Sequence, residues 1–237
     1  RVRKEDCLDL PDKVYTRRLV ELTPEQKKLY DQMKRTAIAV IEGEGFVSAP
    51  TVLTQLLRLQ QVCSGFAKLE DDRVIEVPSN KLNELMSVLE ETSGKVIIWG
   101  NFTHDLHIIE KALKKQYGEE SIELFYGATP GEERQLIVER FQDPDSPLRF
   151  FVGQPRTGGY GLTLTEAHTV IYYSNGYDLE VRLQSEDRAH RIGQTNKVTY
   201  VDIIAENTVD EKVIQALRDK INISTQVLAE GYKEWII

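Results

Sequence analysis

The chain has 237 residues, of which 41% are hydrophobic and 29% charged, which is the composition of an ordinary globular protein. No apolar run approaches the ~20 residues of a membrane helix, so we expect no membrane association. The formal net charge of −8 argues against binding nucleic acid over the whole surface, but it is compatible with a local basic groove.

The first 70 residues predict a mainly helical segment. A strand is expected from Val14 to Val20. Thr23 then resembles an N-cap, Pro24 follows it, and Gln26 completes a capping box, so a helix should begin there. A second helix is expected over residues 52–62.

Strands and helices alternate from residue 95 onward. A hairpin-like turn near residues 70–73 and a helix over 81–91 come first. The predicted strands cover 96–99, 123–126, 149–152, 169–173 and 198–204, and the helices between them cover 103–117, 130–141, 161–167 and 179–191, with Thr103 and Thr129 as helix caps. This alternation predicts right-handed βαβ units, hence an α/β fold with a mainly parallel sheet between two helical layers. A last helix should begin at Val209.

Cysteine usage and the amino end bear on the compartment. Two cysteines, Cys7 and Cys63, are too few for a disulfide framework or a zinc site, and the charged first residues do not resemble a signal peptide. We therefore expect a cytoplasmic protein without a metal site of its own.

One segment presents two arginines and an amide at helical spacing. Gln184, Arg188 and Arg191 stand at i, i+4 and i+7, so a helix would place them on one face. Guanidinium groups bind phosphate oxygens in pairs, so this face suits a polyphosphate. The alternative is a solvated face on which Glu180 pairs with Gln184 and Asp187 pairs with Arg191. Taken alone, the segment favours that alternative.

A glycine-rich turn upstream changes the balance. Residues 156–164, Arg-Thr-Gly-Gly-Tyr-Gly-Leu-Thr-Leu, follow an apolar strand, and backbone N–H groups at such a junction can face an anion. One strand, 169–173, separates this turn from the arginine segment. We therefore expect both at the carboxyl edge of the sheet, where open α/β sheets bind ligands.

These two segments resemble motifs V and VI of the Swi/Snf family of superfamily 2 helicase-like ATPases. Residues 184–194 match the family pattern Gln-x-x-Asp-Arg-x-His-Arg-Ile-Gly-Gln throughout. Residues 97–103, 126–134 and 208–214 resemble further motifs of the family. Thr163 stands where the family usually has Asn, and residues 174–178 replace its Asp-x-x-Trp-Asn-Pro. These departures resemble the compact bacterial and phage branch more than the eukaryotic chromatin remodellers.

The resemblance implies a C-terminal RecA-like lobe over residues 71–205, an inter-lobe helical segment over 1–70 that includes the tail of lobe one, and a C-terminal helix and tail over 206–237 packing on the lobes. ATP and Mg²⁺ would be held by an N-terminal RecA-like lobe of the same protein, and double-stranded DNA would be bound through its backbone. The resemblance implies that Arg188 and Arg191 are arginine fingers and that Gln184 and Asp187 orient those arginines or sense nucleotide. It implies that Gly159 and Gly161 couple the nucleotide cleft to DNA. Sequence-independent contacts with DNA phosphates would be made by Asn101, Thr103, Thr157, Thr163 and Thr165.

The sequence lacks two parts that ATP hydrolysis requires. It contains neither a Gly-x-x-x-x-Gly-Lys-Thr phosphate loop nor an acidic box for Mg²⁺. We therefore expect the motor half of a DNA-dependent ATPase that does not hydrolyse ATP alone. One alternative is a non-catalytic DNA- or protein-binding module that retains the lobe's fold. An independent Rossmann-like enzyme is less favoured, because no Gly-x-Gly-x-x-Gly follows the first strand of the sheet.

Overall fold

The computed structural model describes residues 10–43, 49–69, 71, 73–157 and 161–219. Its elements in chain order are β1 (Lys13–Val20), α1 (Pro24–Gly43), α2 (Ala49–Cys63), β2 (Phe66–Lys68), β3 (Val74–Glu76), α3 (Lys81–Glu90), β4 (Val96–Trp99), α4 (Thr103–Tyr117), η2 (Glu119–Ser121), β5 (Ile122–Phe125), α5 (Gly131–Gln142), β6 (Phe150–Gly153), β7 (Thr169–Tyr172), α6 (Leu179–Glu186), β8 (Val198–Ala205) and α7 (Val209–Arg218). The chain forms two compact units. The first contains Arg1–Arg18, Val88–Ser174 and Glu180–Asp202, and the second contains Leu19–Ser87, Asn175–Leu179 and Ile203–Ile237.

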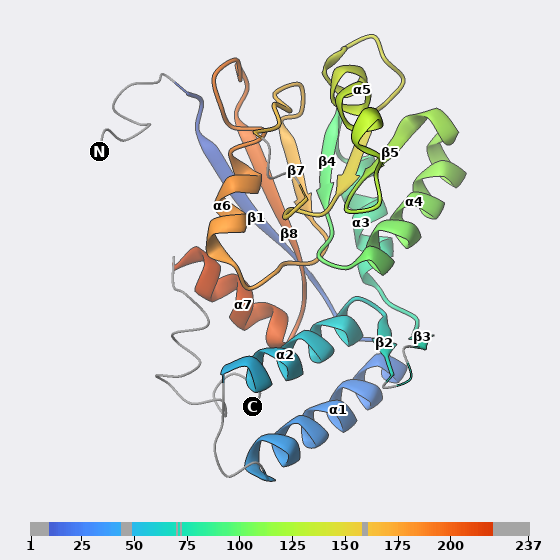
Figure 1. Ribbon diagram of the computed structural model, residues 1–237, viewed down its shortest axis with the longest axis vertical. Helices are drawn as coiled ribbons and strands as arrows, with labels where there is room; N and C mark the ends of the chain where they lie inside the picture. The colour runs from blue at the N-terminus through green and yellow to red at the C-terminus, as the bar shows by residue number, and fades with distance from the viewer. Residues whose placement is uncertain (1–9, 44–48, 70, 72, 158–160, 220–237) are drawn as a thin grey trace. The chain divides into compact units, whose positions relative to one another are not determined.

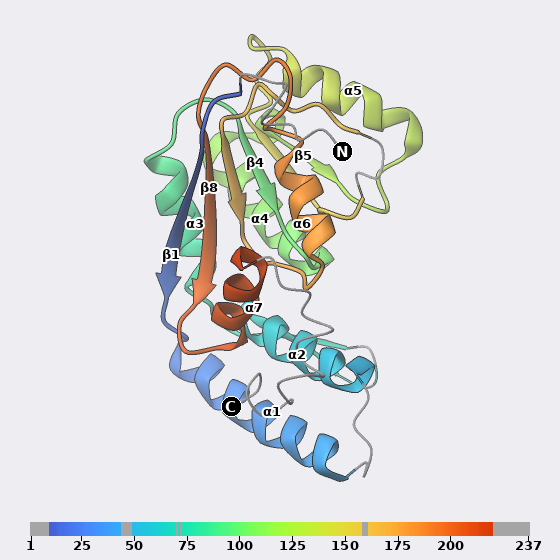
Figure 2. The same ribbon diagram turned by 90° about the vertical axis from the view of Figure 1, so that its left-hand side faces the viewer.

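Six strands form one sheet in the order β1-β8-β7-β4-β6-β5 (Figure 1). β4 pairs in parallel with β6 and β7, β5 pairs in parallel with β6, and β7 pairs in parallel with β8. β1 lies beside β8 at one edge (Figure 2), and the bonds from Val198 N to Asp12 O and from Glu206 N to Val20 O give it the same direction. The segment 1–70 therefore contributes a strand to this sheet, whereas the predicted domain division itself stays a prediction.

Helical and loop segments cover both faces of the sheet. Alternate strand residues on one face pack with Ile137 and Phe141 of α5 and with the segment 164–167, in a core that includes Ile97, Trp99, Phe125, Phe151, Val170, Tyr172 and Tyr200. On the other face, the rings of Phe150 in β6 and Tyr117 in α4 lie 4.9 Å apart. The predicted α/β class with a mainly parallel sheet between two layers is confirmed.

Local sequence predicts some helix ends correctly and others wrongly. At the start of α1 the capping box is present, because Gln26 N donates to Thr23 Oγ1 at 3.2 Å and Thr23 N donates to Gln26 Oε1 at 3.1 Å. Thr103 and Thr129 are not caps: Phe102 and Pro130 occupy the N-cap positions of α4 and α5 without a side-chain hydrogen bond. Thr129 Oγ1 instead accepts from Tyr126 N, because Thr129 belongs to the tight turn after β5.

Two predicted helices around the arginine segment are wrong in extent. Residues 161–167 contain no helix, because Leu164 N donates across to Arg188 O instead of to its own segment. The helix expected over 179–191 ends at Glu186 as α6, and turns follow it. Arg188 and Arg191 therefore lie beyond the helix, and the argument that they share a helical face with Gln184 fails.

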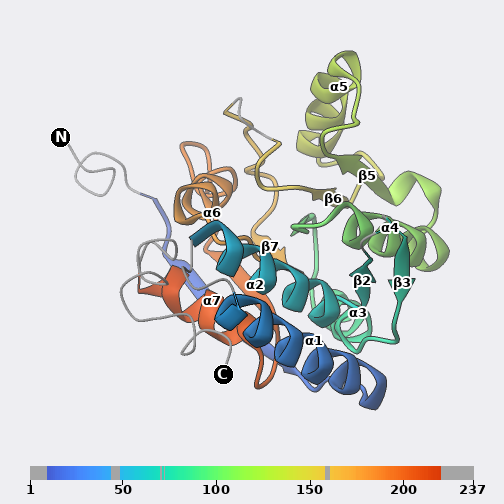
Figure 3. The same cartoon turned by 60° about the horizontal axis from the view of Figure 1, so that its bottom comes forward.

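The second unit is held by buried polar contacts. Its helices α1 and α2 lie side by side (Figure 3), and Gln26 Nε2 donates to Val62 O at 2.8 Å. A buried ion pair joins Lys81 Nζ to Asp210 Oδ2 at 2.6 Å, and Gln60 Nε2 lies 3.4 Å from the other oxygen of Asp210. Within the described residues, no helix combines the length and the apolar character needed to cross a membrane.

Candidate functional site

A buried ionic network fixes the end of α6. Glu186, 3% exposed, accepts hydrogen bonds from Arg182 Nε at 2.9 Å, Tyr15 OH at 2.7 Å and Lys13 Nζ at 3.2 Å. Arg182 Nη1 also donates to Asp202 Oδ1 at 2.6 Å. Hydrogen-bonded and paired charges are the form in which buried ionic groups are tolerated. The network therefore sets where the chain leaves the helix and enters the loop that carries Arg188 and Arg191.

Arg188 lies against the carboxyl ends of two central strands. Its side chain is buried, its guanidinium carbon lies 5.7 Å from the centre of the Trp99 ring, and Nη2 donates to Pro155 O at 3.5 Å. Burial lowers the pKa of the Arg188 guanidinium below its ordinary value. A guanidinium nevertheless stays protonated in proteins, so a desolvated positive charge lies at the start of the glycine-rich turn.

Arg191 holds the far side of the same turn. Its Nη1 donates to Gly161 O at 3.0 Å and to Leu162 O at 3.1 Å, and Leu164 N donates to Arg188 O at 3.0 Å. Among the described residues, Arg191 makes these hydrogen bonds through Nη1 only. The structure thus brings Arg188, Arg191 and Gly161 together.

Gln184 and Asp187 do not join this group. Gln184 is exposed and donates to Glu180 Oε1 at 3.1 Å, as the solvated-face alternative requires. Asp187 lies 3.7 Å from Lys13 Nζ. Asp187 is not paired with Arg191, since the bonds of Arg191 go to main-chain carbonyls.

Three of the predicted phosphate-contacting residues gather at the carboxyl edge of the sheet. Gln154 Nε2 lies 3.5 Å from Asn101 O and 3.4 Å from Thr103 Oγ1, and Thr157 N donates to Gln154 O at 3.1 Å. Sequence reasoning missed Gln154, although its position directly after β6 places it at this edge. The group Asn101, Thr103, Gln154 and Thr157 is a polar, partly exposed cluster.

Thr165 lies elsewhere. It is four residues before the amino end of β7, and its Oγ1 accepts from Gln142 Nε2 at 3.1 Å. Thr163 is half-buried in the segment 161–167. Gly159 lies outside the described residues. The structure therefore does not bring all five predicted phosphate contacts together.

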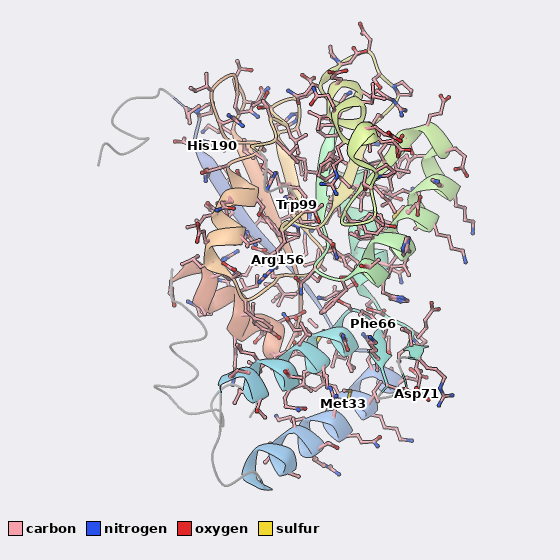
Figure 4. All side chains as sticks on the ribbon, viewed as in Figure 1. Met33, Phe66, Asp71, Trp99, Arg156 and His190 are labelled. Carbon is pink, nitrogen blue, oxygen red and sulfur yellow. The ribbon has the colours of Figure 1, made fainter. Side chains whose placement is uncertain are left out.

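The two motifs do not share one edge of the sheet in the way we expected. The glycine-rich turn follows the carboxyl end of β6, but the loop after α6 leads into the amino end of β8. The motifs meet because residues 161–167 return along the sheet face and because the Arg188 side chain reaches back to Pro155. Figure 4 labels Trp99 and Arg156, which lie toward the strand ends, and His190, which lies near the start of β1.

Residues near the start of β1 also contact the arginine loop. A ring nitrogen of His190 lies 2.6 Å from Pro11 O, and Lys13 and Tyr15 bind Glu186 as described above. No local signal in the sequence indicates these contacts, because more than 170 residues separate the partners. In the part of the chain that the structure describes, no group of three or more His, Cys, Asp or Glu side chains is arranged to hold a metal ion.

Comparisons with known proteins agree with the fold and the motifs. Residues 80–193 match the family model described as the helicase conserved C-terminal domain. The chain is 30% identical over 234 residues to an uncharacterized ATP-dependent helicase of Mycoplasma genitalium, covering 97% of this chain and 22% of that protein. It is 28% identical over 243 residues to the human SWI/SNF-related matrix-associated actin-dependent regulator of chromatin subfamily A member 1, covering 98% and 23%.

A solved structure extends the agreement to three dimensions. The Sulfolobus solfataricus SWI2/SNF2 ATPase core in complex with dsDNA superposes with a TM-score of 0.71 at 27% identity, covering 97% of this chain and 49% of that one. The chain thus spans under a quarter of the length of the two curated relatives and about half of this structure.

Proposed function

Since the chain belongs to the Swi/Snf family of superfamily 2 helicase-like ATPases, of which it forms a RecA-like C-terminal lobe, we propose that it is the second motor lobe of an ATP-driven DNA translocase. A two-lobe protein would combine it with an N-terminal lobe that carries the phosphate loop and the acidic box. ATP bound on that lobe supplies the phosphoryl group that is transferred to water. The present chain contributes arginines and a DNA-contacting edge.

The observation that carries this proposal is the joining of the two arginines to the glycine-rich turn. Arg188 donates to Pro155 O, at one end of the turn, and Arg191 donates to Gly161 O and Leu162 O, at the other. Two fixed guanidiniums beside one turn fit a triphosphate, because each binds phosphate oxygens with a planar fork. We assign Arg188 and Arg191 as the arginine fingers. They would neutralise charge that develops on the γ-phosphate in the transition state.

Gln184 and Asp187 have a different place in the proposal. Their contacts with Glu180 and Lys13 direct them away from the arginines, which supports a role in fixing α6 and the loop after it. Mg²⁺ would be held by the N-terminal lobe, because the sequence of this chain has no acidic box for Mg²⁺ beside a phosphate loop.

The DNA part of the proposal rests on the carboxyl-edge cluster. Asn101, Thr103 and Thr157 offer neutral donors around Gln154, and such groups contact backbone phosphates without reading sequence. The complex of the Sulfolobus solfataricus relative with dsDNA supports a duplex as the partner. Opening and closing of two lobes on ATP turnover would then move the protein along DNA.

The arginine assignment is tested in the two-lobe protein with Arg188→Ala and Arg191→Ala. We expect DNA-stimulated kcat to fall on the order of 10³-fold or more, with little change in the KM for ATP or in duplex affinity, because a finger acts mainly on the transition state. Lysine should not rescue, since it lacks the planar fork. Arg140→Ala is the matched control, because Arg140 of α5 forms a surface ion pair with Glu123 of β5. Near-normal turnover in both alanine variants would refute the assignment.

Measurements on the chain alone separate the motor from the alternative, a non-catalytic binding module. The chain alone should not turn over ATP, because its sequence has no phosphate loop. Its binding of duplex DNA should be weak and independent of sequence. The logarithm of the binding constant should fall with the logarithm of the salt concentration with a slope of only about 0.9 per phosphate contacted. Tight, sequence-selective binding by the chain alone, measured with unrelated duplexes across a salt series, would favour the module.

A further inference from the structure

Gln194, the last residue of the arginine segment, uses its whole side-chain amide inside the protein. It is 5% exposed, and its Nε2 lies 3.0 Å from Thr165 O, 3.1 Å from Ala167 O and 3.1 Å from Ala189 O. Its Oε1 accepts from Asn196 N at 2.8 Å. One amide therefore binds three carbonyls and one N–H, drawn from two separate segments.

These two segments are residues 161–167 and the loop after α6, which together contain Gly161, Arg188 and Arg191. Thr165 and Ala167 end the stretch that begins at Gly161, and Ala189 lies between the two arginines in sequence. Among the described residues, the other hydrogen bonds between the stretches run from Leu164 N to Arg188 O and from Arg191 Nη1 to Gly161 O and Leu162 O. The Gln194 amide is thus the one buried side chain, among the described residues of this site, that ties the main chains of both stretches together.

The backbone around Gln194 is built for this position. Gly193 has φ of +101°, a conformation that favours glycine, and Gln194 N donates to Arg191 O at 3.0 Å. This tight turn directs the Gln194 side chain back under the loop. Three carbonyl oxygens converge on Nε2, so the position requires a donor, and a carboxylate there would face three partial negative charges.

We propose that Gln194 is a positioning residue that holds Arg188 and Arg191 at the geometry needed for phosphoryl transfer. This inference rests on the proposed arginine-finger function. Gln194 itself is buried and touches no reactant, so it acts through the loop. A misplacement of a catalytic group by about 1 Å can lower turnover on the order of 10²-fold, so loss of the clamp should appear in kcat.

The test is Gln194→Met in the two-lobe protein, since methionine has a similar length and no donor. Arg149→Met is the matched control, because the Arg149 guanidinium also donates to three main-chain carbonyls, those of Leu89, Thr92 and Gly94. Both variants should lower the melting temperature. Only Gln194→Met should lower DNA-stimulated kcat, on the order of 10- to 100-fold, while the KM for ATP and duplex affinity stay near those of the parent protein.

Four outcomes decide between these possibilities. If Gln194→Met loses no more turnover than Arg149→Met, the positioning role is wrong, whereas the arginine assignment stands as long as Arg191→Ala is inactive. If Arg188→Ala and Arg191→Ala both keep near-normal turnover, the proposed arginine-finger function itself fails. In an Arg191→Ala background, Gln194→Met should have a much smaller effect than in the parent, and an undiminished effect would overturn the inference. Should Gln194→Met not fold, Gln194→Asn keeps the amide one methylene short, and an unchanged kcat in that variant would overturn it as well.

Discussion

Replacing Arg182 with methionine should destabilise the first unit strongly, because Arg182 neutralises two carboxylates in its interior. Arg182 and Asp202 have side-chain exposures of 8% and 1%, and Nη1 lies 2.6 Å from Asp202 Oδ1. The guanidinium also lies 3.5 Å from the centre of the Tyr172 ring. Methionine retains much of the apolar length but leaves Asp202 buried without this cation. Removing one partner of a buried pair costs about 3–5 kcal/mol.

The loss of Arg182 also affects Glu186, but this adds little to the expected loss of stability. Glu186 keeps hydrogen bonds from Tyr15 and Lys13, so the loss falls mainly on Asp202. For a chain of this size, about 3–5 kcal/mol corresponds to a fall in melting temperature of roughly 6–20 °C. Urea unfolding followed by circular dichroism should show the midpoint shift with an unchanged slope.

Two further variants make the reasoning refutable. Arg140→Met, which breaks the exposed pair with Glu123, should cost no more than about 1 kcal/mol. Adding Asp202→Asn to Arg182→Met should recover part of the loss, since it removes the carboxylate charge that had lost the Arg182 guanidinium, giving a coupling of about 0.5–3 kcal/mol. A cost for Arg182→Met no greater than that for Arg140→Met, or full additivity of the two changes, would show that the buried pair does not stabilise the fold as argued.

Two other predictions concern packing. Gly153→Ala should lower the free energy of unfolding by about 1–3 kcal/mol, because a Cβ there would collide with Phe125 O. Gly131→Ala, whose Cβ would meet nothing within 4 Å, should be neutral or stabilise α5 by up to about 1 kcal/mol. Equal effects of the two changes in urea unfolding would contradict this reasoning. Burial, together with the nearby Asp210 carboxylate, raises the pKa of the Cys63 thiol, so a thiol reagent at pH 8 should modify Cys63 only when the protein unfolds. The Cys63→Ala variant gives the background labelling. Rapid modification of Cys63 in the native protein would be inconsistent with the packing.

The alternation of strands and helices was predictable because it depends on local signals. Short apolar runs such as 96–99 and 169–172 are buried on both faces of a parallel sheet, so they read as strands without any knowledge of their neighbours. The capping box at Thr23 and Gln26 is equally local, and it forms as expected. Thr103 failed as a cap because a threonine before a helix is only a weak indicator when Phe102 can occupy the N-cap position.

The arginine segment was misjudged because its geometry depends on distant partners. α6 ends at Glu186, whose carboxylate is bound by Tyr15 and Lys13, both more than 170 residues earlier. Leu164 N donates to Arg188 O across a gap of 24 residues, which removes the helix expected after the glycine-rich turn. Such contacts leave no periodic pattern in the sequence. The i, i+4, i+7 spacing was therefore used to place Arg188 and Arg191 on a helical face although the helix ends before them.

This difference changes what controls the arginines. On a continuous helix, their separation would follow from the helical repeat, and substitutions along α6 would move both together. In the observed loop, Arg191 is placed by the carbonyls of Gly161 and Leu162, and Arg188 by its contacts with Trp99 and Pro155. Their separation therefore depends on the positions of Pro155 on one side and of Gly161 and Leu162 on the other. Pro155 follows β6 at the sheet edge that carries the proposed DNA contacts. We therefore predict that a displacement of Pro155, Gly161 and Leu162 would move both arginines without any change in α6.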